Sequence, residues 1–429
     1  MASTSISRTP SSTGNRQTWT FSAWVKRSEL STNQKIFEAS PDGSNTTDIR
    51  LKTDDTLQVY SEVGGVTKYN LKTNRKLRDT SAWYHVVIAV DTTQGTSSNR
   101  VKIYVNGVQE TSFATINYPS QNYQFAVNNT TQHMIGREDG NGTGYFDGSM
   151  SYFAFVDGTA ELPTIFGETD SVTGQWKIKT DITPSVAWGN NGFLILKNGN
   201  SLTDESTNTN NFTLGGGTLT NTLDCPSNVF ATLNPLVISE LASLSKGNNT
   251  ITGTSASNNS HSPATLQVGT SGKYYYEVKV TANESGGSEY SADGIVPNAE
   301  VIQQGTGAAG FFPKLYFDCQ GKVERSSLGT GLSDLTGLTS VGSTGIKMFA
   351  IDMDNGAIYI GANGVWLNNG SAVGVPTSGG SKTGAMWSFT PSDYPNIAIC
   401  SSAYNGSVTN YNFGNGTFGT TAVSSAGTA

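Results

Sequence analysis

The sequence predicts an all-β protein made of two antiparallel, jelly-roll-like β-sandwich domains joined by a strand-containing connector. Apolar side chains repeat with a period of two along many short segments, as in half-buried strands. Of the 429 residues, 49 are Gly, and Ser, Thr and Asn are abundant, whereas the helix formers Lys, Glu and Leu are sparse. This mixture favours short strands joined by tight turns. The 17 Tyr, 18 Phe and 7 Trp are enough to build compact cores.

Residues 1–170 carry the clearest strand signals. The segment Thr18–Lys26 alternates strictly, and its other face also holds Trp24, which predicts that this strand is covered on both sides. Trp83–Asp91 is nearly continuous in apolar residues, as in the middle of a sandwich. Gly-Gly at 64–65 and Asn-Gly at 106–107 separate alternating arms and predict hairpins. Turn signals recur at intervals typical of a sandwich.

The segment 171–235 is predicted to be a connector, and 236–429 the second sandwich. Gly215–Gly217, Pro226 and Pro235 punctuate the connector, which still contains strand patterns. The best helix candidate in the chain is the short stretch 236–247. In the second half, strand alternation resumes at Gly272–Ala282.

Charge and cysteine content exclude several classes of protein. The net charge is -7, and a nucleic-acid binder normally carries a basic surface. We interpret the densest basic run, Lys68–Asp79, as a solvated loop rather than a contact to phosphate or acidic glycan. No apolar run approaches the ~18 residues of a membrane span, and no apolar core of a signal peptide is present. The three cysteines are predicted to be free thiols, and the protein is predicted to be made in a reducing cytoplasm.

The stretch Phe349–Gly370 resembles an acidic metal loop at first sight. A calcium loop of the EF-hand type needs an oxygen ligand at its fifth position, where this chain has Gly356, and Glu at its twelfth, where it has Asn363. The flanking alternation predicts a hairpin instead, with a type I′ turn or a close relative at Asn355-Gly356, and with aspartates bonded to turn amides.

Catalytic patterns are weak. Of the three histidines, His85 lies inside an apolar strand and is predicted to be a satisfied core side chain. No G-x-S-x-G elbow, phosphate loop or strand with closely spaced acids for glycoside cleavage is present. The sequence therefore predicts a protein that is not an enzyme.

Residues 1–170 resemble the laminin-G/concanavalin A-like lectin sandwich through "WTFSAWVKR", "WYHVVIAVD", "RVKIYVNGVQ" and the segment from "MIGRE" to "FAFVDGTA". By this resemblance His85 belongs to a structural strand and Asp147 to a structural turn. Residues 236–429 resemble a SPRY-like sandwich through "GKYYYEVKV", "IDMDNGAIYIGANGVW" and "NFGNGTF". The stretch that begins at "YSADGIVPNAE" departs from the usual SPRY strand.

The order of these parts, with "FGETDSVTGQW" and "PSNVFATLNPL" between them, resembles structural proteins of tailed phages, particularly marine and cyanophage-like ones. The resemblance implies a virion component made in the host cytoplasm and exposed on the particle. It implies other virion proteins as partners and a homo-oligomer. It implies neither nucleic-acid binding nor membrane insertion. The chain begins close to its first strand without a long anchor helix, which argues against a standard long fibre and leaves an architectural role open.

Two loops are predicted to contact a ligand, which would be a host-surface polysaccharide. The candidate residues are Tyr118, Tyr123, Glu138, Asp139, Asn141 and Tyr145. No cofactor is expected. Calcium held at Asp139 and Asp147 is the alternative. The leading hypothesis is a tail-associated or fibre-like receptor-binding protein. A capsid-decoration or tail-joining protein is the second hypothesis, and a polysaccharide depolymerase is the third.

Overall fold

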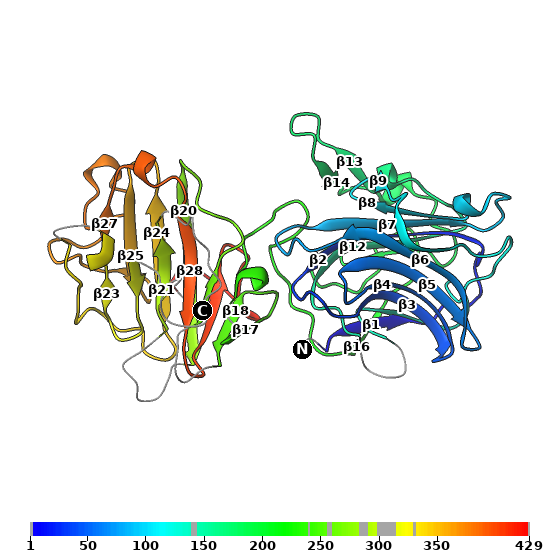
Figure 1. Ribbon diagram of the computed structural model, residues 1–429, viewed down its shortest axis with the longest axis horizontal. Helices are drawn as coiled ribbons and strands as arrows, with labels where there is room; N and C mark the ends of the chain where they lie inside the picture. Colours follow the sequence, from blue (N-terminus) through cyan, green and yellow to red (C-terminus); the bar gives the residue numbers. More distant parts are fainter. Residues whose placement is uncertain are drawn as a thin grey trace. The chain divides into compact units, whose positions relative to one another are not determined.

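The computed structural model describes residues 3–138, 144–238, 241–254, 260–282, 291–297, 315–328 and 332–427. Within these residues every long element is a β-strand, and the helices are single 3-10 turns, as the sequence predicts (Figure 1). The turns are η1 (Ser97–Asn99), η2 (Pro163–Ile165), η3 (Thr183–Ser185), η4 (Pro235–Val237), η5 (Ser326–Leu328), η6 (Gly379–Ser381) and η7 (Pro391–Asp393). None of these helices has the length and apolar character required to cross a bilayer.

The chain divides into two compact units. Unit 1 contains Met1–Asn221 and Cys225–Val229, and unit 2 contains Thr222–Asp224 and Phe230–Ala429.

Unit 1 contains an eight-stranded antiparallel sheet, called sheet A. Its strand order is β10-β6-β5-β4-β3-β11-β1-β16. The strands are β1 (Ser5–Arg8), β3 (Gln34–Asp42), β4 (Asn45–Leu51), β5 (Thr56–Val63), β6 (Val66–Lys76), β10 (Phe113–Asn117), β11 (Gln132–Ile135) and β16 (Thr213–Gly216).

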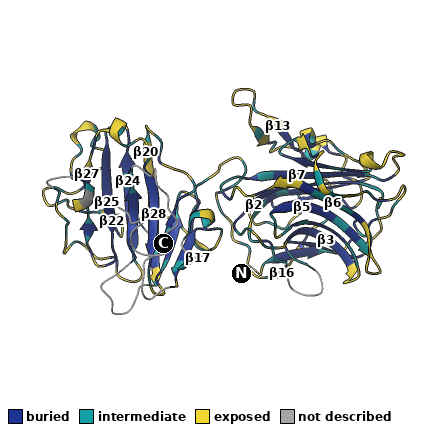
Figure 2. Cartoon of the chain, viewed as in Figure 1, coloured by how far each residue is buried: buried dark blue, intermediate teal, exposed yellow. Residues whose placement is uncertain are grey.

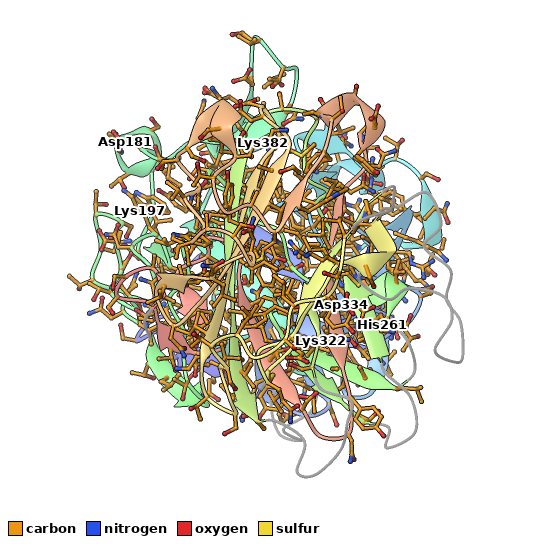
Figure 3. All side chains as sticks on the ribbon, turned by 90° about the vertical axis from the view of Figure 1, so that its left-hand side faces the viewer. Asp181, Lys197, His261, Lys322, Asp334 and Lys382 are labelled. Carbon is orange, nitrogen blue, oxygen red and sulfur yellow. The ribbon has the colours of Figure 1, made fainter. Side chains whose placement is uncertain are left out.

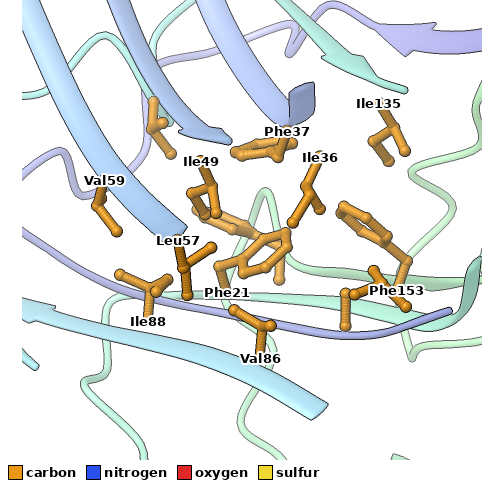
Figure 4. Close-up of a cluster of buried hydrophobic side chains, with 14 of the residues drawn as sticks. Phe21, Ile36, Phe37, Ile49, Leu57, Val59, Val86, Ile88, Ile135 and Phe153 are labelled. Carbon is orange, nitrogen blue, oxygen red and sulfur yellow. The ribbon is translucent and has the colours of Figure 1, made fainter. Parts of the chain in front are cut away.

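The second sheet of unit 1, sheet B, has the order β15-β12-β2-β7-β8-β9. Its strands are β2 (Thr18–Arg27), β7 (Tyr84–Asp91), β8 (Val101–Val105), β9 (Val108–Gln109), β12 (Gly148–Asp157) and β15 (Phe193–Ile195). The inner faces of sheets A and B form one core, in which Phe21 of sheet B stacks on Phe37 of sheet A at 5.5 Å between ring centroids (Figure 4).

The division into units differs from the boundary drawn at residue 170. Strand β15 pairs with β12, and β16 pairs with β1 at the edge of sheet A. Because these pairings extend the sheets of unit 1, most of the segment 171–235 lies in that unit.

A stretch of this segment covers the outer face of sheet B. The cover segment, residues 163–188, contains η2, η3 and the hairpin of β13 (Gly167–Thr169) and β14 (Trp176–Ile178). Its Phe166, Ile182 and Trp188 pack against Val87 and other outward residues of sheet B. The prediction that β2 is covered on both sides is confirmed, because Trp24, on its outer face, is only 3% exposed.

Unit 2 also contains two main antiparallel sheets. Sheet F has the order β17-β18-β29-β20-β24-β25-β26, and sheet G the order β19-β28-β21-β22-β23. The strands of sheet F are β17 (Ala242–Ser245), β18 (Thr250–Gly253), β20 (Lys273–Ala282), β24 (Ile346–Asp352), β25 (Ala357–Ala362), β26 (Val365–Trp366) and β29 (Val408–Asn412), with β27 (Trp387–Ser388) paired to β25. Those of sheet G are β19 (Ser260–Pro263), β21 (Asp293–Val296), β22 (Leu315–Phe317), β23 (Val323–Glu324) and β28 (Ala398–Ala403).

A short hairpin of β30 (Thr417–Phe418) and β31 (Thr421–Ala422) follows sheet F in the chain. Apolar side chains of both main sheets form the core of unit 2, which contains the ring pair of Tyr276 and Phe349, stacked at 4.7 Å. Cys319 and Cys400 are buried, and Cys225 is half-buried, all as free thiols.

The predicted hairpins at Gly64-Gly65 and Asn106-Gly107 are confirmed. Both residues of each turn have positive φ, as a type I′ turn requires. The hairpin of β24 and β25 is also confirmed, but its turn is not of type I′. Only Gly356 has a positive φ, and its N–H donates to Asp352 O across a four-residue loop. Asp352 Oδ1 accepts from Asn355 N, the expected aspartate–amide contact.

Two other local predictions are wrong. The helix candidate 236–247 holds the end of η4 and strand β17. Pairing of β17 with β18 overrides a weak local helix propensity there. The basic run Lys68–Asp79 is not a loop, because most of it forms β6, in register with β5 and β10. Its lysines alternate with buried Tyr69 and Leu71, and a period-two signal was present in the run.

Candidate functional site

The outer face of sheet A carries a ladder of polar side chains on adjacent strands. One row, in register across β3, β4, β5 and β6, consists of Glu38, Asp48, Tyr60 and Asn70. The neighbouring row consists of Lys35, Arg50, Gln58 and Lys72. We call these eight residues, with Glu62, the polar face.

Strand geometry places these residues together. Successive side chains of a strand point to opposite faces of the sheet. In β4 and β5, the residues that alternate with the polar ones belong to the core: Ile49, Leu51, Leu57 and Val59. The same alternation that buries the apolar residues therefore aligns the polar ones on the outer side.

The polar face is buried at β3 and β4. Lys35 Nζ lies 2.7 Å from Asp48 Oδ2 and 3.7 Å from Glu38 Oε1. The side chain of Asp48 is 0% exposed and that of Lys35 5%. Glu38 Oε1 also accepts a hydrogen bond from Thr46 Oγ1 at 2.7 Å. Desolvated carboxylates of this kind depend on their cationic partner.

The polar face opens toward β5 and β6. Arg50, 19% exposed, pairs with Asp48 at 3.2 Å and donates to Gln58 Oε1 at 2.8 Å. Its guanidinium lies over the ring of Tyr60, 4.5 Å from the centroid. Gln58 Nε2 continues the chain of hydrogen bonds to Asn70 Oδ1 at 2.7 Å. Each planar group is thereby held in one orientation.

The open end has a second set of paired charges. Lys72 Nζ lies 2.5 Å from Asp54 Oδ2, with side chains 24% and 42% exposed. Partial burial acts to raise the pKa of Asp54, but hydrogen bonds from Lys72 and Thr56 lower it to about 2. Tyr60 donates its hydroxyl to Glu62 at 2.6 Å, and burial together with that carboxylate raises the pKa of Tyr60.

Opposite charges nearly balance on this surface. The cations are Lys35, Arg50, Lys52 and Lys72, and the anions are Glu38, Asp48, Asp54 and Glu62. Such an array projects little net field and offers fixed donors and acceptors. Its chemistry suits a ligand rich in hydroxyl groups better than a polyanion.

The first predicted loop contributes to packing. Tyr123 lies against the core of unit 1, with its ring 5.0 Å from that of Phe125, and its hydroxyl is 3.0 Å from Ser61 Oγ. Tyr118 is also partly buried against this core. Burial raises the pKa of both phenols. Neither ring is a fully exposed stacking platform.

The second predicted loop borders the polar face. Asp139 and Asn141 lie outside the described residues, as does most of the loop around them. Glu138 and Gly144 flank that gap, and Gly144 O accepts a hydrogen bond from Lys35 N at 2.8 Å. Tyr145 and Asp147 are half-buried, and Asp147 O accepts from Ser28 N. Among the described side chains, no group of three or more His, Cys, Asp or Glu is arranged to hold a metal ion.

His85 lies on the outer face of sheet B, beneath the cover segment. Its ring stacks between Trp24, at 4.6 Å, and Trp176 of the cover segment, at 6.0 Å. Trp176 Nε1 donates to His85 Nδ1 at 3.0 Å, so the neutral ring carries its proton on Nε2 and donates it to Ser22 Oγ at 2.9 Å. Burial lowers the pKa of His85 to about 3. The imidazole is fully partnered and neutral, as expected for a core residue.

The polar face contains two neighbouring carboxylates, Glu38 and Asp48, that no single-strand acidic pattern predicts. Glu38 and Asp48 face each other across β3 and β4, whereas the acidic pattern of β-glucan-cleaving enzymes lies on one strand. Both are buried and paired with Lys35. A glycosidase acid must reach the glycosidic oxygen, and these two side chains are used in ion pairs beneath the surface.

Unit 2 has a smaller polar cluster on strands β22 and β23. Lys322 Nζ lies 2.8 Å from Glu324 and 3.4 Å from Asp334 (Figure 3). Tyr316 donates its hydroxyl to Glu324 at 2.5 Å. Because the cluster ends beside residues outside the described ranges, the polar face of unit 1 is the better defined site.

Comparison with protein families gives one match. The model of the concanavalin A-like lectin/glucanases superfamily matches residues 2–165, the region whose motifs resemble that superfamily. The curated proteins gave no match.

Comparison with solved structures gives distant similarities. A heptameric pentraxin of Limulus polyphemus is 20% identical, with 37% of this chain and 71% of that chain covered and a TM-score of 0.28. The SPRY domain of human HERC1 is 14% identical, with 42% and 98% covered and a TM-score of 0.29. A putative carbohydrate-binding protein of Bacteroides ovatus is 18% identical, with 53% and 62% covered and a TM-score of 0.33. None of these scores supports an argument about ligand or activity.

Proposed function

We propose that the polar face of sheet A binds a carbohydrate and that the chain is a non-enzymatic attachment protein of a tailed-phage particle. The observation that carries the proposal is the row of hydrogen-bonded groups left partly open on β4, β5 and β6. The superfamily match over residues 2–165 agrees with a lectin-like role. The resemblance of "FGETDSVTGQW" and "PSNVFATLNPL" to phage structural proteins supports the location.

The geometry of the face favours a polysaccharide. Sugar hydroxyls both donate and accept, and Arg50 and Asn70 supply donors and acceptors whose orientation is fixed by Gln58, which is itself only 6% exposed. Because these side chains are already held by one another, binding costs little of their conformational entropy. The pairing of charges favours a neutral or mixed-charge polymer of the host surface over nucleic acid.

The test is binding of the full chain to purified host-surface polysaccharides on an array. Arg50→Ala removes a charged donor and should weaken binding about tenfold or more. Lys102→Ala is the matched control, because Lys102 is a half-buried strand residue on the other sheet. Equal binding by both variants, or no binding by the wild type, contradicts the proposal. Release of reducing sugar would instead show a depolymerase.

A second function, joining parts of the particle or decorating its capsid, is favoured by the β13–β14 hairpin. Its tip presents Val172, which is 91% exposed, and a neighbouring virion protein would cover that side chain. Labelling of the chain on intact particles separates the two functions. We expect label on the tail and a symmetric homo-oligomer there, whereas label on the capsid with no polysaccharide binding would favour decoration.

A further inference from the structure

The core of unit 2 contains a completely buried lysine–aspartate pair. Lys347 lies on β24 of sheet F and Asp293 on β21 of sheet G. Lys347 Nζ is 2.6 Å from Asp293 Oδ2, and both side chains are 0% exposed. The pair therefore bridges two sheets that otherwise face each other through apolar packing.

The surroundings fix both groups. Tyr411 donates its hydroxyl to Asp293 Oδ1, the oxygen that does not contact the lysine. Lys347 Nζ donates to Ser291 O at 2.7 Å. The ring of Tyr276 lies 6.5 Å from that of Tyr411 in a nearly parallel arrangement. An amine, a carboxyl group and a hydroxyl donor are thus enclosed among aromatic rings.

These are the reactants of an amide bond, held in contact without solvent. Fixing two reactants at such a distance replaces a bimolecular encounter by an intramolecular one. Exclusion of water removes the competing hydrolysis. We propose that Lys347 and Asp293 condense to form an isopeptide bond that covalently joins sheets F and G.

The step is balanced without any further reactant. A proton passes from the Lys347 ammonium to Asp293 Oδ2, which gives an amine and a carboxylic acid. The amine lone pair attacks Cγ of Asp293, and Tyr411 stabilises the charge that develops on Oδ1. The C–Oδ2 bond breaks as a second proton moves from nitrogen to that oxygen. The products are one amide and one water molecule.

The electrostatics hold Lys347 in its charged form beside Asp293 before the reaction. Burial acts to lower the pKa of Lys347, but the adjacent Asp293 carboxylate outweighs it and raises that pKa. The reaction therefore begins from the ammonium, and Asp293 Oδ2, 2.6 Å away in a site closed to solvent, is the acceptor for its proton.

The experiment is intact-mass spectrometry of the denatured full chain, before and after incubation. We expect a species lighter by the mass of one water molecule. Trypsin should then yield a branched product that links the peptide 280–314 to 326–382, since a modified Lys347 is not cleaved. Full recovery of separate linear peptides and the unmodified mass after incubation would overturn the proposal.

The Asp293-Gly294 sequence offers another route to the same mass loss, by cyclisation to a succinimide. A succinimide remains within one linear peptide and is cleaved by hydroxylamine, whereas the isopeptide bond links two peptides and resists it. Water loss confined to a linear, hydroxylamine-sensitive peptide would therefore also overturn the proposal.

Variants assign the roles. Lys347→Met should abolish the mass loss, and Lys279→Met, on the neighbouring strand with its amine 6.0 Å from the centre of the Phe418 ring, should retain it. Tyr411→Phe keeps the ring and should slow the reaction by roughly 100-fold, as for loss of one oxyanion donor. An unchanged rate in Tyr411→Phe would overturn the role given to Tyr411.

Discussion

The two outer faces of unit 1 have opposite chemistry. The outer face of sheet B is apolar and aromatic, and residues 163–188 cover it. The outer face of sheet A is polar, with its charges paired, and it stays partly open at β5 and β6 (Figure 2). Apolar area exposed to water has to be buried, whereas a satisfied polar array does not. The comparison separates a face used for stability from a face available to a ligand.

Removal of the Trp176 ring tests whether the cover segment stabilises the outer face of sheet B. Trp176→Ala deletes the side chain that stacks on and hydrogen-bonds His85. Because Trp176 is half-buried, we expect unit 1 to lose about 2–3 kcal/mol of unfolding free energy in chemical denaturation, less than for a fully buried aromatic ring. Val172→Ala, in the same hairpin but 91% exposed, should change it by less than about 0.5 kcal/mol. Similar small effects from both variants would show that the cover segment is not docked.

On the polar face, the stability lost when a cation is removed should depend on how deeply its ion pair is buried. Lys35→Met leaves Asp48 buried with one cation fewer and should cost about 3 kcal/mol. Lys72→Met breaks the exposed pair with Asp54 and should cost about 1 kcal/mol or less. Urea titration of both variants gives the comparison, and equal losses would contradict the gradient of burial across the sheet.

The turn beneath Trp176 allows a backbone test. Gly107 has a φ of +78°, and an added Cβ would lie 2.5 Å from the Trp176 ring. Gly107→Ala should therefore cost about 2 kcal/mol or more, from strain and displacement of the ring. Gly64 has a φ of +61° with nothing within 4 Å, so Gly64→Ala should cost only about 1 kcal/mol. Thermal unfolding that ranks Gly64→Ala as the more damaging change would be inconsistent with a docked Trp176.

Acid should weaken the covered face through His85. Burial lowers the pKa of His85 from 6.5 to about 3, so between these values the unfolded chain binds a proton that the folded chain does not. The contribution of His85 to the unfolding free energy is fully present above pH 6.5. It declines by about 1.4 kcal/mol per pH unit as the pH falls below that value. His85→Gln should make the measured dependence shallower by that amount. An unchanged slope would mean that His85 is not held neutral in the folded state.

Most of the fold is predictable from the sequence because the alternation of apolar and polar residues along a strand is a local property. The hairpins at residues 64–65 and 106–107, the strand of Trp19 and Phe21, and the all-β class all follow from period two and turn residues. The roles of Trp176 and of β16 depend on pairing with residues 91 and more positions away. No local pattern reports such contacts, and therefore the sequence alone predicts a connector for the segment 171–235.

The polar face was harder to find for the same reason. Its side chains come from four strands, and only the register brings Glu38, Asp48 and Tyr60 into one row. The Tyr and Asn residues of the loop Glu138–Tyr145 predict a ligand contact in that loop, and the structure places its residue Gly144 beside Lys35 of the polar face. The alternation within Lys68–Asp79, which places Lys72 opposite buried Tyr69 and Leu71, is a local signal for this outer face.

The most direct test of the central claim is hydrogen exchange of the full chain with and without a bound host polysaccharide. We predict protection of backbone amides in β4, β5 and β6, residues 45–76, and no change in β8 and β9, residues 101–109. Protection confined to β7–β9 or to residues 163–188, with none in β4–β6, would contradict the assignment of the polar face as the ligand surface.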